Sequence, residues 1–356
     1  MFRPREAAEE GVQGVRERWE ERLGGLARFA ARHQGVFWTL HSIWALGWGV
    51  AFLVVGATRP QLLRFGLVSV GVVWLTSLVL PAVLSSSWIP REREGAARKL
   101  VLWGQKYLLQ GLAWFLLPLY HSSATYPSRQ VPFMVCLGLA ALAVTIDVVY
   151  DEVVARRRPL FGVFLAFVAF ACVNITLPMV WRVGGFWNLA ASGALATAVF
   201  VSFVAEHEKG RPVRTVVRTA GVGLFFLVLV TLGRPAVPPA PLKVVSVHFG
   251  TTLADNGLDV AAPLESLPPD IPVRLVAVAA IQAPADLQEG VRLIWSVDGQ
   301  VLFESRLIEI TGGRGRGFRS RSGASLPALR PGQRVRLEVE TAHGQLIGRA
   351  ELEARR

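Results

Sequence analysis

Seven long apolar stretches occupy most of residues 36–233, and they constrain the fold more than any other feature. Each is close to the length of about 20 residues that a helix needs to cross a bilayer. They are apolar on all sides, whereas a surface helix of a soluble protein is apolar along one stripe. Backbone polar groups in lipid must be hydrogen-bonded internally, so we predict a bundle of about seven transmembrane helices. The stretches are 36–56, 65–84, 100–120, 131–149, 160–181, 185–205 and 217–233.

The basic residues between these stretches predict their orientation. With a cytoplasmic N-terminus, the inner segments carry 18 Lys and Arg, whereas the short outer loops carry four: Arg59, Arg64, Arg129 and Arg182. Basic residues concentrate on the cytoplasmic side of membrane proteins. We therefore expect a multi-pass protein of the bacterial inner membrane, with everything after residue 234 in the periplasm. The lipid bilayer is its first expected partner.

The composition changes near residue 240, which predicts a second domain. Residues 1–240 have 24 basic and 13 acidic groups, whereas residues 241–356 have 14 and 13. Over the whole chain 52% of residues are hydrophobic and 18% are charged, against about 25% charged in an average soluble domain. This composition excludes a disordered protein and disfavours a purely soluble enzyme. The predicted domains are a cytoplasmic helix (1–35), the membrane region (36–233), a Pro-rich linker (234–243) and a periplasmic domain (244–356).

Residues 1–35 lack the apolar core and cleavage site of a signal peptide. Their apolar residues, among them Val15, Trp19 and Leu23, recur at spacings of three and four, as in an amphipathic helix. Such a helix either lies on the inner leaflet or docks a cytoplasmic partner, or it is a solvated leader packed on the bundle.

Two charged side chains lie inside predicted spans, where charges are costly and usually functional. Lys106 and Asp147 belong to consecutive antiparallel helices at similar depth. Three interpretations remain open: a buried structural ion pair, long side chains that reach the membrane surface, or an ion or substrate site. Asn174 and Asn188 lie in the next two spans, where amides commonly form hydrogen bonds between helices.

The last 113 residues or so predict a small all-β domain of the sandwich type. Val291, Leu293, Trp295 and Val297 alternate with polar residues, and Asp298-Gly299 is typical of a type I′ hairpin turn. A second hairpin is expected at His343-Gly344. We expect Trp295 to be buried between two sheets. No disulfide is available to this domain, because Cys136 and Cys172 both lie in the predicted spans.

Several segments of this domain resemble the bacterial domain of unknown function 2914. They are VHFGTTLADNG, IWSVDGQVLFE, ITGGRGRGFRSRSG and ETAHGQLIGRAELE. Trp295, Gly299, Arg319, Ser322 and Gly344 match positions of that family, whereas Gln333 and Arg334 stand where the family often has an aromatic residue. The resemblance implies a β fold and a multi-span, uncharacterised bacterial membrane protein. It implies no reaction, substrate or cofactor.

The segment GGRGRGFRSRSG places four arginines within eight residues: Arg314, Arg316, Arg319 and Arg321. Guanidinium groups bind phosphates and carboxylates, so this segment is a candidate site for anionic lipid, an anionic glycan or an envelope protein. The alternative is a solvated strand edge whose charges discourage aggregation. No nucleic acid is expected, because the domain is nearly neutral and lies across the membrane.

The motifs of common enzymes are missing from the sequence, which has no CxxC, HExxH, P-loop or GxGxxG. No catalytic, metal-binding or cofactor-binding residue is predicted. The function favoured by the sequence is therefore a non-enzymatic envelope protein whose membrane anchor presents a periplasmic binding domain. One alternative is a transporter or channel, and a second is a membrane-embedded enzyme that modifies lipid. The ligand and the oligomeric state are not indicated.

Overall fold

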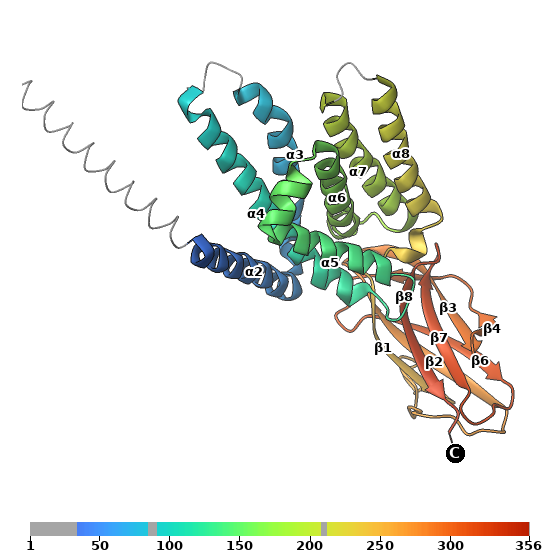
Figure 1. Ribbon diagram of the computed structural model, residues 1–356. Coiled ribbons are helices and arrows are strands. Elements are labelled where there is room, and N and C mark those ends of the chain that lie inside the picture. The colour runs from blue at the N-terminus through green and yellow to red at the C-terminus, as the bar shows by residue number, and fades with distance from the viewer. Residues whose placement is uncertain (1–33, 85–90, 208–211, 356) are drawn as a thin grey trace, which may run out of the picture. The chain divides into compact units, whose positions relative to one another are not determined.

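The computed structural model describes residues 34–84, 91–207 and 212–355 (Figure 1). The chain divides into two compact units, Met1–Trp48 and Gly49–Arg356. Helix α2 (Gln34–Thr58) runs across this boundary, and in the first unit Trp44 and Trp48 stack with ring centroids 6.5 Å apart. The amphipathic helix predicted for residues 1–35 falls almost wholly on residues 1–33, which lie outside the described part of the chain.

The second unit begins with a helical region. Each of the seven predicted stretches of the chain lies mostly in helix. Short helical turns η1 (Pro60–Leu63), η2 (Val148–Ala155) and η3 (Arg234–Ala236) connect the longer helices or follow them. The longer helices are α3 (Arg64–Leu84), α4 (Arg91–Ser123), α5 (Val131–Thr145), α6 (Arg158–Val180), α7 (Gly185–His207) and α8 (Pro212–Thr231).

The prediction of seven clear spans is too high for the described residues. Three helices there are long and apolar enough to cross a membrane, within α6, α7 and α8, and a bent pair of helices would make four. In α2 and α3 the corresponding apolar segments are shorter, Ile43–Thr58 and Arg64–Val79. Helix α4 is long, but its middle carries Gln105, Lys106 and Gln110, all buried. Two of these groups bind other segments: Gln105 Nε2 donates to Thr76 Oγ1 of α3 at 2.7 Å, and Lys106 pairs with Asp147 before η2.

The fourth predicted stretch is broken rather than continuous. Helix α5 ends at Thr145, Ile146 has extended backbone angles, and the π-helical η2 then runs at 105° to α5. The apolar pattern of residues 131–149 continues through Ile146 and is interrupted only by Asp147, directly after the break.

Helix α6 lies at the centre of the helical core. Its residues Leu165, Phe170 and Ile175 are fully buried, and it packs on α7 and α3. Helix α7 also packs on α8 (Figure 1). Many residues of α8 are exposed. Polar contacts add to this core, since Trp74 Nε1 of α3 donates to Ser202 Oγ of α7 at 2.8 Å.

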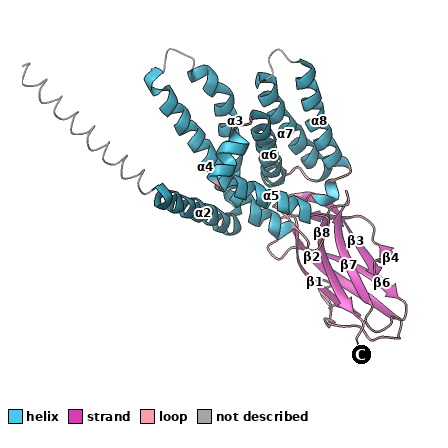
Figure 2. Cartoon of the chain, in the orientation of Figure 1, coloured by secondary structure: helices cyan, strands magenta, loops and turns pink. Residues whose placement is uncertain are grey.

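The C-terminal region is a sandwich of two antiparallel sheets, as predicted (Figure 2). One sheet has the order β1-β2-β6, and the other has the order β4-β3-β7-β8 with β5 also paired to β3. The strands are β1 (Lys243–Gly250), β2 (Val273–Gln282), β3 (Gln288–Val297), β4 (Gln300–Glu304), β5 (Ile308–Thr311), β6 (Phe318–Leu326), β7 (Arg334–Thr341) and β8 (Leu346–Glu353).

The sandwich encloses a hydrophobic core of its own, to which both sheets contribute. Trp295 is fully buried there, as predicted, with its ring 5.8 Å from that of Phe249 on the opposite sheet. Both predicted hairpins are present, and Asp298 and Gly299 have the positive φ angles, 47° and 87°, of a type I′ turn.

Strand register shows which loops share an end of the sandwich. Gln282 pairs with Lys243, where the chain enters the sandwich, Phe318 pairs with Ile281, and Gln288 pairs with Thr311. The loops 283–287 and 312–317 therefore lie at the same end, together with the β7–β8 turn at residues 342–345. We call this the helix-facing end. The C-terminus lies at the opposite end (Figure 1).

The Pro-rich residues 234–243 are packed rather than forming a free extended spacer. They begin with the short turn η3, and Val237, Ala240 and Leu242 are buried. Gln345 Nε2 of the β7–β8 turn donates to Val237 O at 3.0 Å. The connection is therefore part of the interface between the helices and the sandwich.

Candidate functional site

The two charged residues predicted inside the helical region are in contact. Lys106 Nζ of α4 forms an ion pair with Asp147 Oδ1, and both side chains are buried. The break between α5 and η2 positions this aspartate, because Asp147 is the residue that precedes η2. The structure therefore contains the buried ion pair that was the first of the three interpretations of Lys106 and Asp147.

The ion pair has further neighbours at the start of η2. Lys106 Nζ lies 3.7 Å from Asp151 Oδ2 and 5.3 Å from the centre of the Tyr150 ring. Asp151 is mostly exposed, whereas Tyr150 is buried. The cluster therefore runs from the helical core to the protein surface, and two carboxylates can share one ammonium group.

A chain of polar groups connects three helices near the sandwich. Asn174 Nδ2 of α6 donates to Tyr120 Oη of α4 at 3.0 Å, and Asn188 Nδ2 of α7 donates to Asn174 Oδ1 at 2.9 Å. Both asparagines therefore bond between helices, as predicted. Asn188 Oδ1 is buried and accepts no hydrogen bond from the described residues. It borders a cavity of about 20 Å³, which is large enough for one water molecule.

The same cavity adjoins the main contact between the helices and the sandwich. The Glu289 carboxylate of β3 accepts the backbone N–H of Gly185, the first residue of α7. A carboxylate at this position also interacts favourably with the helix dipole. Burial raises the pKa of Glu289, and the N–H groups of Gly185 and Gly290 oppose that rise.

Glycines allow this close approach. A Cβ atom at Gly184 would lie 2.6 Å from Glu289 Oε2, and one at Gly185, where φ is +56°, would lie 2.8 Å from the His343 ring. An ion pair between Arg182 and Asp286 at 2.8 Å lies beside it. Glu289 and Gln345 were not predicted as junction residues. The only local sign of a close contact was the pair Gly184-Gly185 at the start of the sixth apolar stretch.

The four predicted arginines are divided between a turn and an edge strand. Arg314 and Arg316 lie in the β5–β6 turn and are exposed, whereas Arg319 and Arg321 lie on β6, the edge of the three-stranded sheet. In the described part of the chain none of the four forms an ion pair. Arg314 instead stacks on Phe318, with Cζ 4.7 Å from the ring centre.

Arg319 and Arg321 point to the outer face of their sheet, beside a loop that folds over it. On this face His248 Nδ1 and Asp259 Oδ1 are 2.7 Å apart. Burial acts to raise the pKa of Asp259, but the hydrogen bonds from His248 and from the N–H of Val260 lower it, and the charge of Arg319 adds a smaller effect in the same direction. Arg319 Nη1 is buried and has no hydrogen-bond partner among the described residues. This pair of arginines is therefore separate from the turn that carries Arg314 and Arg316.

The turn that carries Arg314 and Arg316 lies at the helix-facing end of the sandwich. Gly312 N donates to Leu287 O at 2.9 Å, and Gly313 N donates to Ala283 O at 3.2 Å. These bonds fix the turn beside the loop whose Asp286 pairs with Arg182 of the α6–α7 connection. The exposed guanidinium groups are thus held near the helix ends.

Other chemistry is not evident in the described residues. Within residues 34–84, 91–207 and 212–355 no group of three or more His, Cys, Asp or Glu is arranged to hold a metal ion. Cys136 is exposed and Cys172 is buried, and neither forms a disulfide.

Comparison with solved structures gives only weak likenesses. An immunoglobulin-like protein from Pseudomonas aeruginosa is 11% identical at a TM-score of 0.22, and the alignment covers 33% of this chain and 98% of that one. An alkylpurine DNA glycosylase from Pseudomonas fluorescens bound to DNA is 12% identical at 0.22, covering 71% and 82%. A β-galacturonidase from Eisenbergiella tayi is 10% identical at 0.20, covering 32% and 18%. TM-scores this low support no argument.

Comparison with protein families is more informative. No curated protein matches the sequence. A family model does match residues 16–267, which include all the helices described above and the first strand of the sandwich. The match covers most of the chain, whereas the resemblance of the sandwich to domain of unknown function 2914 remains an expectation. The chain therefore belongs to the family of unknown function DUF5924.

Proposed function

We propose that this protein is a non-enzymatic component of the bacterial inner membrane that holds a periplasmic β-sandwich at the membrane surface, where the sandwich binds an anionic partner. About seven helical segments form the anchor, and the N-terminus is cytoplasmic. The distribution of basic residues supports this orientation. So do the exposed Trp181, directly after α6, and Trp187, near the start of α7, because indole rings favour the headgroup region.

The position of the β5–β6 turn carries the proposal. Arg314 and Arg316 are exposed, have no ion-pair partner in the described residues, and lie at the end of the sandwich that contacts the helices. In a membrane, this end faces the lipid headgroups of the outer leaflet. Guanidinium groups bind phosphate through paired hydrogen bonds. Anionic phospholipid is therefore the favoured partner, ahead of an anionic glycan or an envelope protein.

The orientation is tested with reporter fusions. An enzyme that is active only outside the cytoplasm, fused after Pro241, should be active in cells, and the same enzyme fused after Arg158 should be inactive. The reverse pattern would overturn the proposed location.

The anionic partner is tested with the purified sandwich, residues 242–356. It should sediment with vesicles that contain phosphatidylglycerol, and salt should weaken this binding. The double variant Arg314→Ser/Arg316→Ser should lose most of it. The matched control is Arg274→Ser/Arg330→Ser, which removes the same charge from the opposite end and should leave binding unchanged. Equal loss in both variants would mean that net charge, rather than the turn, is responsible.

One observation favours a second candidate function, transport. Helix breaks next to buried charges are typical of transporter ion sites, and Lys106 and Asp147 meet at the break between α5 and η2. The two functions differ in proteoliposomes that contain a pH-sensitive dye. An anchor should conduct no more protons than empty vesicles. A proton flux that Asp147→Asn abolishes would favour the transporter.

A further inference from the structure

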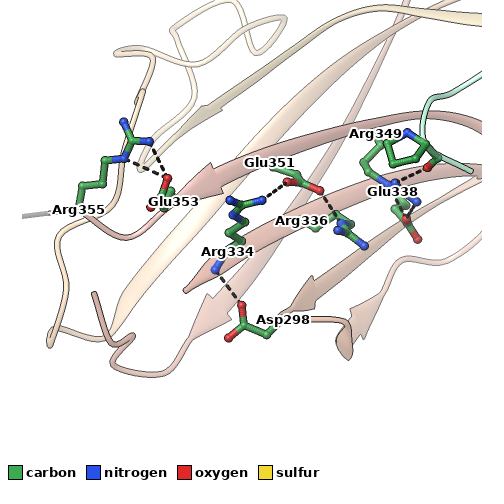
Figure 3. A network of polar contacts seen from close by, with 9 residues as sticks. Asp298, Arg334, Arg336, Glu338, Arg349, Glu351, Glu353 and Arg355 are labelled. Carbon is green, nitrogen blue, oxygen red and sulfur yellow. Dashed lines mark hydrogen bonds and ion pairs between the residues drawn. The ribbon is translucent and has the colours of Figure 1, made fainter. Parts of the chain in front are cut away.

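Cross-strand ion pairs cover the outer face of β7 and β8 (Figure 3). Arg336 Nε donates to Glu351 Oε1 at 2.8 Å, and Arg334 lies 3.9 Å from the same carboxylate. Closer to the helix-facing end, Arg349 donates to Glu338, with its Nη2 2.7 Å from Oε1. Each of these charged residues of β7 therefore has an opposite charge on β8.

Glu340, the next outward-facing residue of β7, departs from this pattern. Its partner on β8 is Leu346, at a register shift, and its neighbour on β3 is Arg292. Arg292 donates instead to Glu304 Oε1 at 2.7 Å. Within the described residues, Glu340 forms no ion pair.

The surroundings of Glu340 favour a positive charge in direct contact with its carboxylate. Burial, and then the negative charges of Glu338 and Glu304, raise the pKa of Glu340, while Arg292 and Arg129 oppose that rise. A cation placed beside this carboxylate would relieve both the repulsion and the cost of burial.

A groove lies directly over this position. It is lined by Glu338, Glu340 and Arg349 on the sandwich and by Pro127, Ser128 and Arg129 in the α4–α5 connection, and its volume is about 740 Å³. This is within the range of small-molecule sites, about 300–1,000 Å³. Arg349 Nη1 donates to Pro127 O at 2.9 Å, which fixes one wall to the other.

The groove offers two unpaired charges of opposite sign. Glu340 is negative, and the exposed Arg129 forms no ion pair with the residues described. Glu338 is already held by Arg349, so a single carboxylate is left. That is too few ligands for a calcium ion, which takes six to eight oxygens. The arrangement suits one molecule that carries an ammonium group and an anionic group.

We infer that this groove binds the headgroup of phosphatidylethanolamine, with its primary ammonium at Glu340 and its phosphate at Arg129. The inference rests on the proposed function, in which the helix-facing end of the sandwich lies at the membrane surface. The α4–α5 connection then places the groove at the depth of the headgroups. A lipid of the same leaflet can enter it from the side.

The test uses the full-length protein in detergent, titrated with short-chain phosphatidylethanolamine, phosphatidylcholine and phosphatidylglycerol. Phosphatidylethanolamine should bind about tenfold more tightly than phosphatidylcholine, because a quaternary ammonium donates no hydrogen bond to Glu340. Glu340→Gln should remove this preference, while Arg129→Gln should weaken both lipids. Glu309→Gln, an exposed carboxylate outside the groove, is the matched control and should change neither.

Competition experiments distinguish a lipid headgroup from a protein as the occupant of the groove. Soluble phosphoethanolamine should compete with the lipid, since the headgroup provides both charged groups. Competition by a lysine-containing peptide, with no preference between the lipids, would overturn the inference in favour of a protein partner. Equal binding of phosphatidylethanolamine and phosphatidylcholine would also overturn it. If vesicle binding through Arg314 and Arg316 nevertheless persists, the proposed function stands and only the groove assignment fails.

Discussion

Trp295 shows how one residue can determine the core of the sandwich. Its indole is fully buried, and Nε1 donates to Ser322 Oγ on the opposite sheet at 3.1 Å. The side chain thus joins the two sheets by packing and by a hydrogen bond. Trp295→Ala should lower the free energy of unfolding by about 3–5 kcal/mol. Urea unfolding of residues 242–356 measures this, and Trp295→Phe should cost less. A loss below 1 kcal/mol would contradict this account of the core.

Asp298 makes the sandwich sensitive to acid. Its carboxylate accepts the backbone N–H of Arg334 at 3.0 Å and Nε2 of Gln333 at 2.9 Å, and these bonds lower its pKa. Because the pKa is lower in the folded protein, the stabilisation is complete above pH 3.8, the ordinary value, and is lost as the pH falls through the folded-state pKa. Asp298→Asn should therefore show a shallower loss of melting temperature between pH 5 and pH 2. If melting temperature falls with pH in the same way for the wild-type protein and for Asp298→Asn, Asp298 does not cause the sensitivity to acid.

At the scale of helices and strands, the junction between α7 and β3 depends on Gly184 and Gly185, which have no side chains. Gly184→Ala should push Glu289 away from the N-terminus of α7, because the new Cβ atom would lie 2.6 Å from the carboxylate. Limited proteolysis of the full-length protein should then cut the 234–241 connection faster. Gly138→Ala is the control, since its Cβ atom would meet nothing within 4 Å. Equal cleavage rates would show that Glu289 does not hold the junction.

Local sequence patterns predicted many helices and strands correctly. They did not predict where a strand is interrupted because a side chain, rather than a backbone carbonyl, accepts a backbone hydrogen bond. After the predicted Asp298-Gly299 turn, β3 is paired not with one continuous strand but with two, β4 and β5, which are separated by a break. Ser305 Oγ accepts the N–H of Leu293 at 2.9 Å, in place of a backbone carbonyl. The break at Ile146 has a different cause: its N–H still donates to Leu142 O, and an isoleucine is as compatible with a helix as with the extended backbone found there. Alternation and turn dipeptides, in contrast, suffice for β7 and β8.

At the scale of the whole molecule, the interface between helices and sandwich could not be predicted from the sequence. Gln130 Nε2 donates to Leu346 O at 2.7 Å across 216 positions, and Gln345 Nε2 reaches Val237 O across 108. Glutamine in a turn has no local signature of such a contact. The groove at Glu340 was not predicted for the same reason, because its two walls come from segments far apart in the sequence. Charge and hydropathy predicted which residues were unusual, such as Lys106 and Arg314, but not which surfaces come together.

The two hydrophobic cores lead to a prediction for the molecule as a whole. One core contains helical residues together with Val237 and Ala240 of the connection, and the other contains Leu242 together with residues of the strands and their loops. The helices and the strands contact each other much less than they contact their own kind, so we expect two unfolding transitions in detergent. Trp295→Ala should lower the temperature of the sandwich transition alone. Gly184→Ala should separate the two transitions further, because the new Cβ atom acts mainly on the Glu289 carboxylate at the junction and so weakens their coupling. Calorimetry of the full-length variants measures this, and a single transition that both substitutions shift equally would mean that the protein unfolds as one cooperative unit.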